Sequence, residues 1–190
     1  MKSIKLGNQV VVSDPCYSIP TWCQAIVRNV LPGNYRTLVL KSDEGVWGNR
    51  CSHLIAIHED YAHQEEKFRW EQYPSVIGVD SGQAGIFSRE SYRNDQMADQ
   101  IGNGDGEDFG SGFDREEGDK WYRKMCTRTL GNEHWGTYSE GVVSSSGIGD
   151  GSYDLLVAKK NKQVVGFVIN FLLDRRSNKK VVNEEFLTRV

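Results

Sequence analysis

The sequence IKLGNQVVVSDPCY occupies residues 4–17 and is the starting point for the rest of the chain. Its apolar, β-branched run predicts a strand from Ile4 to Val12. Asp14-Pro15 ends that strand, because proline lacks an amide donor and restricts the residue before it. Two more Asp-containing turns follow apolar runs, Val79-Asp80-Ser81-Gly82 and Gly149-Asp150-Gly151-Ser152-Tyr153. Because glycine and proline supply the backbone geometry of tight turns, the three turns predict a sheet edge lined with carboxylates.

Other apolar runs separated by turn residues predict the remaining strands. Pro32-Gly33-Asn34 divides two β-branched segments and predicts a hairpin between residues 25–31 and 35–41. The Asp80 turn predicts a second hairpin or a bulged corner. Further strands are expected at residues 51–58, 75–79, 84–88, 135–144, 153–159 and 164–172, with a turn at Asn161 between the last two.

Helical patterns are few and short. Ser88 is placed as the N-cap of a helix that runs to about Ile101, and residues 119–130 predict an amphipathic helix ended by Gly131. Residues 102–118 hold six glycines and six acidic side chains, a composition that predicts a mobile loop dispensable for folding. Its oxygen donors match a calcium-binding loop only in part: in the register from Asp105 the sixth residue is Gly110 and the twelfth is Glu116, but the fifth is Phe109 and the third is only Glu107.

These elements predict one domain over residues 1–190, with an α+β fold that is rich in β-structure. We expect a twisted, mainly antiparallel sheet with two or three short helices. A chain of 190 residues with 38% hydrophobic residues can bury a substantial core. The formal net charge of −3 gives no general attraction to nucleic acid or to an anionic membrane.

Sequence features also predict the compartment and the state of the thiols. The first residues lack the apolar core of a signal peptide, and no apolar run has the length of a membrane helix, so we expect a cytoplasmic protein. The four cysteines contain no CxxC pair, and reduced thiols are expected. Neighbouring histidines at positions 53, 58 and 63 are five residues apart, a spacing that disfavours a zinc site.

Two motifs with possible chemistry favour structural roles. The glycine-rich segment at residues 147–152 lacks the lysine of a phosphate-binding loop and is followed by a strand, so it predicts a glycine turn. Cys16 follows Asp14-Pro15 in a turn but has no basic neighbour in the sequence to lower the pKa of its thiol. No catalytic residue is identified, and no cofactor is expected.

The carboxylates of Asp14, Asp80 and Asp150 are the remaining candidates. If they converge, they could bind a cation or a ligand, or act as an acid and base pair. Alternatively, each Asp could be a turn-former that binds its own backbone. The expected ligand-binding residues are Asp14, Tyr17, Asp80, Ser81, Asp150, Ser152 and Tyr153, and no metal ligand is assigned.

At these residues the chain resembles a family of bacterial and phage proteins, domain of unknown function 4241. Four blocks carry the resemblance: residues 12–17 with Asp-Pro and a nearby Tyr, 30–35 with Pro-Gly-Asn-Tyr, 78–87 with Gly-Val-Asp, and 146–153 with Gly-Asp-Gly and a Tyr, after which residues 165–171 follow. Relative to that pattern, residues 102–118 look like an insertion. The resemblance implies one fold unit and supports the three Asp positions, but it implies no activity.

Together these observations predict a small intracellular binding protein that recognises a protein partner or a compact ligand. A phage setting would make a host-directed role reasonable by analogy. The alternative is a metal-assisted phosphoester hydrolase that uses the clustered Asp residues. Whether the protein is an enzyme is left open, with binding favoured.

Overall fold

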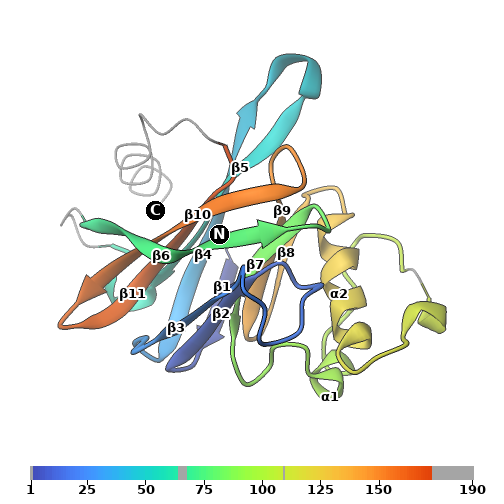
Figure 1. Ribbon diagram of the computed structural model, residues 1–190, viewed down its shortest axis with the longest axis horizontal. Helices are drawn as coiled ribbons and strands as arrows, with labels where there is room; N and C mark the ends of the chain where they lie inside the picture. The colour runs from blue at the N-terminus through green and yellow to red at the C-terminus, as the bar shows by residue number, and fades with distance from the viewer. Residues whose placement is uncertain (1, 64–67, 109, 173–190) are drawn as a thin grey trace.

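The computed structural model describes residues 2–63, 68–108 and 110–172. Within them the chain forms two antiparallel sheets and two α-helices (Figure 1). Sheet A has the order β1-β4-β5-β11-β10-β6, and sheet B has the order β3-β2-β7-β9-β8. The protein is therefore rich in β-structure, as predicted, although its strands form two sheets where one was expected.

Sheet A comprises β1 (Lys2–Leu6), β4 (Gly33–Asp43), β5 (Asn49–His58), β6 (Trp70–Val79), β10 (Gly151–Lys160) and β11 (Gln163–Asn170). Sheet B comprises β2 (Gln9–Ser13), β3 (Ala25–Arg28), β7 (Gln83–Ser88), β8 (Trp135–Tyr138) and β9 (Gly141–Ser145). The helices are α1 (Asp95–Ala98) and α2 (Asp119–Thr129), with short 3-10 turns η1 (Gly45–Trp47), η2 (Glu59–Tyr61) and η3 (Ser111–Phe113).

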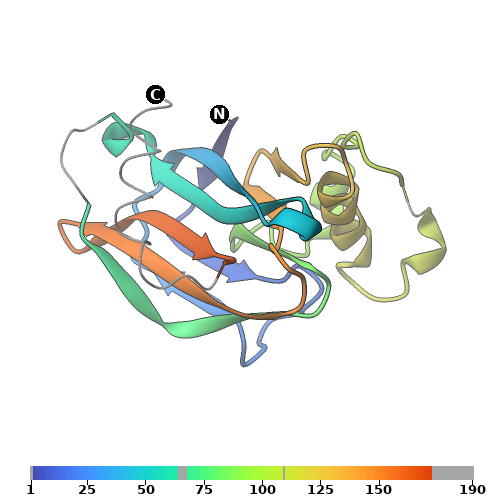
Figure 2. The same ribbon diagram turned by 90° about the horizontal axis from the view of Figure 1, so that it is seen from above.

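Three apolar clusters hold the layers together. The largest lies between the sheets and contains Val12, Ile86, Leu155 and Phe167 among others. A second covers the outer face of sheet A. The third packs the helices on the outer face of sheet B around Trp121, which is fully buried. Both views show the helices grouped at one end of the β-structure (Figures 1 and 2).

The chain passes between the sheets at turns, and this corrects two predictions. The strand expected from Ile4 to Val12 is two strands, since β1 pairs with β4 whereas β2 pairs with β3 and β7. The hairpin expected at Pro32-Gly33-Asn34 is wrong, because β3 belongs to sheet B and β4 to sheet A. Turn chemistry at these positions redirects the chain into another layer, which local sequence cannot distinguish from a hairpin.

Other boundaries also differ from the prediction. The strand expected at residues 75–79 begins earlier, at Trp70. The helix after β7 begins at Asp95, where the Asn94 side chain accepts hydrogen bonds from the amides of Gln96 and Met97, so Ser88 is not its N-cap. The strand expected at residues 135–144 is the β8–β9 hairpin. The corner at Asp80, the turn at Asn161 and the helix over residues 119–130 agree with the prediction.

The described residues of the segment 102–118 contact α2 through charged side chains. Arg123 on α2 forms ion pairs with Asp108 at 2.9 Å and with Asp114 at 3.0 Å. The mobility of this segment stays a prediction. The charged tail after Asp174 lies outside the described residues. In the described ranges, no helix is long and apolar enough to cross a membrane.

Candidate functional site

The Asp14 carboxylate joins the end of β2 to the corner between β6 and β7. Its side chain is fully buried, and it accepts hydrogen bonds from the amides of Cys16, Asp80 and Ser81 at 2.7–2.9 Å. The Ser81 hydroxyl donates a fourth, at 2.7 Å. Because both carboxylate oxygens are occupied by protein donors, Asp14 fixes the corner and does not face a ligand.

Asp80 lies at the same corner but its side chain reaches solvent. The Tyr17 hydroxyl donates a hydrogen bond to Asp80 Oδ2 at 2.5 Å. This hydrogen bond, together with burial, raises the pKa of the Tyr17 phenol above its ordinary value, so the phenol stays protonated and remains a donor. Within the described part of the chain, Asp80 Oδ1 has no hydrogen-bond donor. The corner therefore presents a positioned carboxylate with one oxygen open.

A pocket of about 340 Å³ lies against Asp80. We call it the Asp80 pocket. It is lined by Tyr17, Thr21, Trp22, Cys23, Gly78, Val79, Asp80, Gly151 and Ser152. Three segments far apart in the sequence thus meet here: the loop after β2, the end of β6 and the start of β10. Trp22 is 84% exposed, so its indole face is open to solvent at the pocket.

A close backbone approach forms one wall of the pocket. The Gly78 amide donates to the Cys23 carbonyl at 3.0 Å, which ties the loop after β2 to β6. A Cβ at position 78 would lie 2.7 Å from Cys23 Cβ, so a side chain there would push the loop away from the strand. Glycine is therefore needed at this position for the close contact itself.

The residues of the Asp150 segment have different roles at the pocket. Gly151 pairs with Val79 and Ser152 with Gly78, which puts Asp150 opposite Asp80 just beyond the end of the ladder. Both carboxylates are exposed. Tyr153 instead is buried and donates to the carbonyls of residues 146 and 149, at 2.9 and 2.6 Å, so it holds the glycine turn between β9 and β10.

Of the seven predicted site residues, Tyr17, Asp80 and Ser152 line the pocket, and Asp150 is adjacent to its lining. Asp14, Ser81 and Tyr153 support the turns behind it. The sequence analysis did not identify Thr21, Trp22 and Cys23. The signal that could have pointed to them is a tryptophan in the loop that follows Asp14-Pro15, because loops often carry functional residues.

Arg93 is a further residue that the sequence did not reveal. Its guanidinium donates to the carbonyls of Pro15 and Cys16, each at 3.0 Å, and pairs with Asp119 at 3.0 Å. The loop after β2 is thereby anchored to the start of α2. Burial and the nearby Asp14 carboxylate raise the pKa of the Cys16 thiol despite this cation, so the thiol is a poor nucleophile.

The arrangement of donors does not favour a metal site. Across residues 2–63, 68–108 and 110–172, no three His, Cys, Asp or Glu side chains are grouped so that they could hold a metal ion. Asp108 and Asp114 of the calcium-loop alternative pair with Arg123, and Asp105 accepts from the Asn132 amide at 3.3 Å. These oxygens satisfy protein donors.

Comparisons with known proteins find no matching family model, no matching curated protein and no matching solved structure. The site's own geometry is therefore the basis for a function.

Proposed function

We propose that the protein binds a compact ligand that carries an ammonium or guanidinium group in the Asp80 pocket. The observation that carries the proposal is the open Oδ1 of Asp80 beside an exposed Trp22 face. A carboxylate provides a charge-assisted acceptor for such a cation, and an indole face attracts the same charge. The cation could belong to a small molecule or to a Lys or Arg side chain of a protein partner.

The charges near the pocket agree with a cationic ligand. Asp80 is acidic, and no Lys or Arg is among the described residues that line the pocket. Asp150 lies opposite Asp80, so a bound cation would relieve the repulsion between the two carboxylates. The hydrogen bond from Tyr17 fixes the orientation of the Asp80 carboxylate before a ligand arrives.

The hydrolase alternative has less support. A metal site built from Asp14, Asp80 and Asp150 would require Asp14 to give up hydrogen bonds from three amides and a hydroxyl. That exchange would dismantle the corner that positions Asp80. The proposal keeps the other expectations from the sequence: a twisted α+β fold, a cytoplasmic location, and a bacterial or phage protein of the family it resembles.

The test is titration of the protein with benzylammonium and methylguanidinium, followed by amide and indole NMR shifts. We expect shifts at Trp22, Asp80 and Ser152, and affinity roughly tenfold weaker in Asp80→Asn because the charge is lost. Asp43→Asn is the matched control, since Asp43 is an exposed aspartate at the tip of the β4–β5 hairpin outside the pocket.

Two results would contradict the proposal. One is the absence of shifts at Trp22 and Asp80 with millimolar ligand. The other is an equal loss of affinity in Asp43→Asn, which would show general attraction to a negative surface. Calorimetric titration with magnesium, manganese and calcium distinguishes the binding proposal from the hydrolase alternative. A heat of metal binding that Asp80→Asn abolishes would favour the hydrolase.

A further inference from the structure

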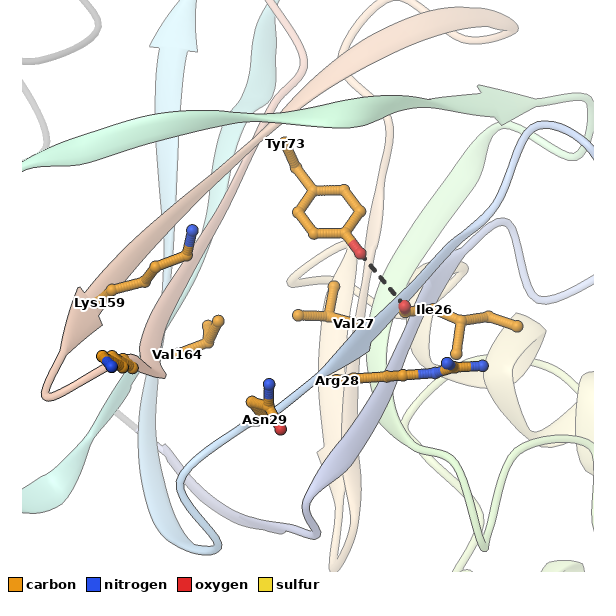
Figure 3. A pocket seen from close by; sticks show the side chains of 8 residues that line it. Ile26, Val27, Arg28, Asn29, Tyr73, Lys159 and Val164 are labelled. Carbon is orange, nitrogen blue, oxygen red and sulfur yellow. Dashed lines mark hydrogen bonds between the residues drawn. The ribbon is translucent and has the colours of Figure 1, made fainter.

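A larger pocket lies where β3 approaches β6, away from the Asp80 pocket. β3 is an edge strand of sheet B, and β6 is an edge strand of sheet A. Its volume is about 570 Å³. We call it the Lys159 pocket. It is lined by Ile26, Val27, Arg28, Asn29, Tyr73, Lys159, Lys162 and Val164 (Figure 3). The Tyr73 hydroxyl donates to the Ile26 carbonyl at 3.2 Å, which joins β6 to β3 at this pocket.

Backbone hydrogen bonds fix the wall formed by Asn29 and Val164. The Val164 amide donates to the Asn29 carbonyl and the Leu31 amide donates to the Val164 carbonyl, both at 2.9 Å. Asn29 has a left-handed φ of 56° at the end of β3. Within the described residues its side-chain amide has no hydrogen-bond partner. The amide is therefore an available donor on a positioned backbone.

The lining has an apolar part and a basic part. Val27, Val164 and the Tyr73 ring provide apolar surface, and the side chains of Asn29, Lys159 and Val164 extend toward the space beneath that ring (Figure 3). The Arg28 side chain extends away from this space in the same view. Lys159 is accordingly the cation that faces this space, and Lys162 is a second cation of the lining.

The local charge is opposite to that of the whole chain. The formal net charge is −3, yet the described lining holds three basic residues and no acidic one. Glu71, outside the lining, lies 3.4 Å from Lys159, but both side chains are about half exposed, so the attraction is weakened by solvent. In the described ranges Lys162 forms no ion pair. A small anion would therefore meet an excess of positive charge.

We propose that the Lys159 pocket binds a compact organic anion, with a phosphate or carboxylate held by Lys159, Lys162 and the Asn29 amide. The apolar body of the ligand lies against Tyr73, Val27 and Val164. A volume of about 570 Å³ suits a small organic molecule, and pockets of this kind combine apolar walls with a few polar groups. This site is separate from the Asp80 pocket, and it does not depend on the function proposed for that pocket.

The experiment titrates the full chain with phenyl phosphate, benzoate and inorganic phosphate, followed by amide NMR and calorimetry. We expect shifts at Asn29, Tyr73 and Lys162, with phenyl phosphate or benzoate binding more tightly than inorganic phosphate because the apolar body contributes. A stronger response to phenyl phosphate would assign the head group as phosphate, and a stronger response to benzoate would assign it as carboxylate.

The double variant Lys159→Gln/Lys162→Gln is expected to weaken binding by roughly tenfold or more, because two charge-assisted hydrogen bonds are lost. Both lysines are exposed, so the variant should fold, which a melting curve checks. Lys5→Gln is the matched control, since Lys5 is exposed on β1 at the opposite edge of sheet A. The absence of shifts with any probe would overturn the proposal, as would an equal loss of affinity in Lys5→Gln.

Discussion

At the scale of single residues, Asp14 and Asp80 differ in what their carboxylates do. Asp14 is buried with four hydrogen bonds from protein donors, whereas Asp80 is exposed and accepts one from Tyr17. The same residue type in two turns thus has two roles. Asp14 stabilises the corner of the fold, and Asp80 lines an open pocket. Burial and the number of donors make the difference.

We therefore predict that Asp14→Asn lowers the free energy of unfolding by roughly 3 kcal/mol. The loss arises because the side-chain NH2 of asparagine would face N–H and O–H groups, which are themselves donors. The hydrogen bonds that the Asp14 carboxylate now accepts from them would then be lost. Asp80→Asn is the comparison and should cost much less, because its side chain is exposed. Urea denaturation of the two variants measures both values, and losses of equal size would show that burial of Asp14 is not the cause.

At the scale of elements, α2 depends on a residue of α1 for its N-terminal cap. Gly118 precedes α2 and supplies no side-chain hydrogen bond. The Asp95 carboxylate accepts from the Gly118 amide at 2.8 Å and from the Trp121 amide at 2.9 Å. The negative charge of Asp95 at the N-terminal end of α2 also interacts favourably with the helix dipole. The two helices are thereby held together over sheet B.

The expected effect of Asp95→Ala is a loss of about 1–2 kcal/mol in the free energy of unfolding, since a capping side chain is removed. Asp99→Ala on the same face removes only an exposed ion pair with Lys120 and should cost less than about 1 kcal/mol. Chemical denaturation monitored by circular dichroism measures both variants. A smaller loss in Asp95→Ala than in Asp99→Ala would refute the capping role.

At the scale of the whole molecule, several tyrosines are buried in the layers. Tyr35, Tyr92 and Tyr138 are at most 7% exposed, and burial is the main cause that raises their phenol pKa values above the ordinary 10.0. Above that pH an unfolded chain releases the three protons while the folded chain keeps them. The stabilisation is complete below pH 10 and is lost as pH rises through the folded pKa values.

Stability should accordingly fall above pH 10, by about 1.4 kcal/mol per pH unit for each tyrosine that ionises only on unfolding. Tyrosinate absorbance and circular dichroism, recorded across the same pH titration, follow ionisation and unfolding together. The late absorbance step should coincide with loss of structure, and Tyr35→Phe should make the decline less steep. Full ionisation of all tyrosines in a still folded protein would disprove the prediction.

Much of the candidate site could be predicted from local sequence. The turns at Asp14, Asp80 and Asp150 follow from proline, glycine and the ends of apolar runs. The three residues lie at strand ends of two sheets, Asp14 after β2 of sheet B and Asp150 before β10 of sheet A, and not along the single sheet edge that was expected. The helix at residues 119–130 also follows from its periodicity. The sequence could not show that Asp14 is buried and Asp80 is open, because donors from distant segments decide this.

Local patterns by themselves determined most of the strand segments, because alternation and turn chemistry act over a few residues. They did not show the first half of β6 or the break between β1 and β2. The tertiary structure decided which sheet each strand joins, as at Pro32-Gly33, where an expected hairpin is a passage between layers. It also decided the two pockets, since the approach of β3 to β6 brings Trp22 near Asp80 and Asn29 near Lys159. Pairing of distant strands depends on burial of the whole core, and no short stretch of residues encodes that energy.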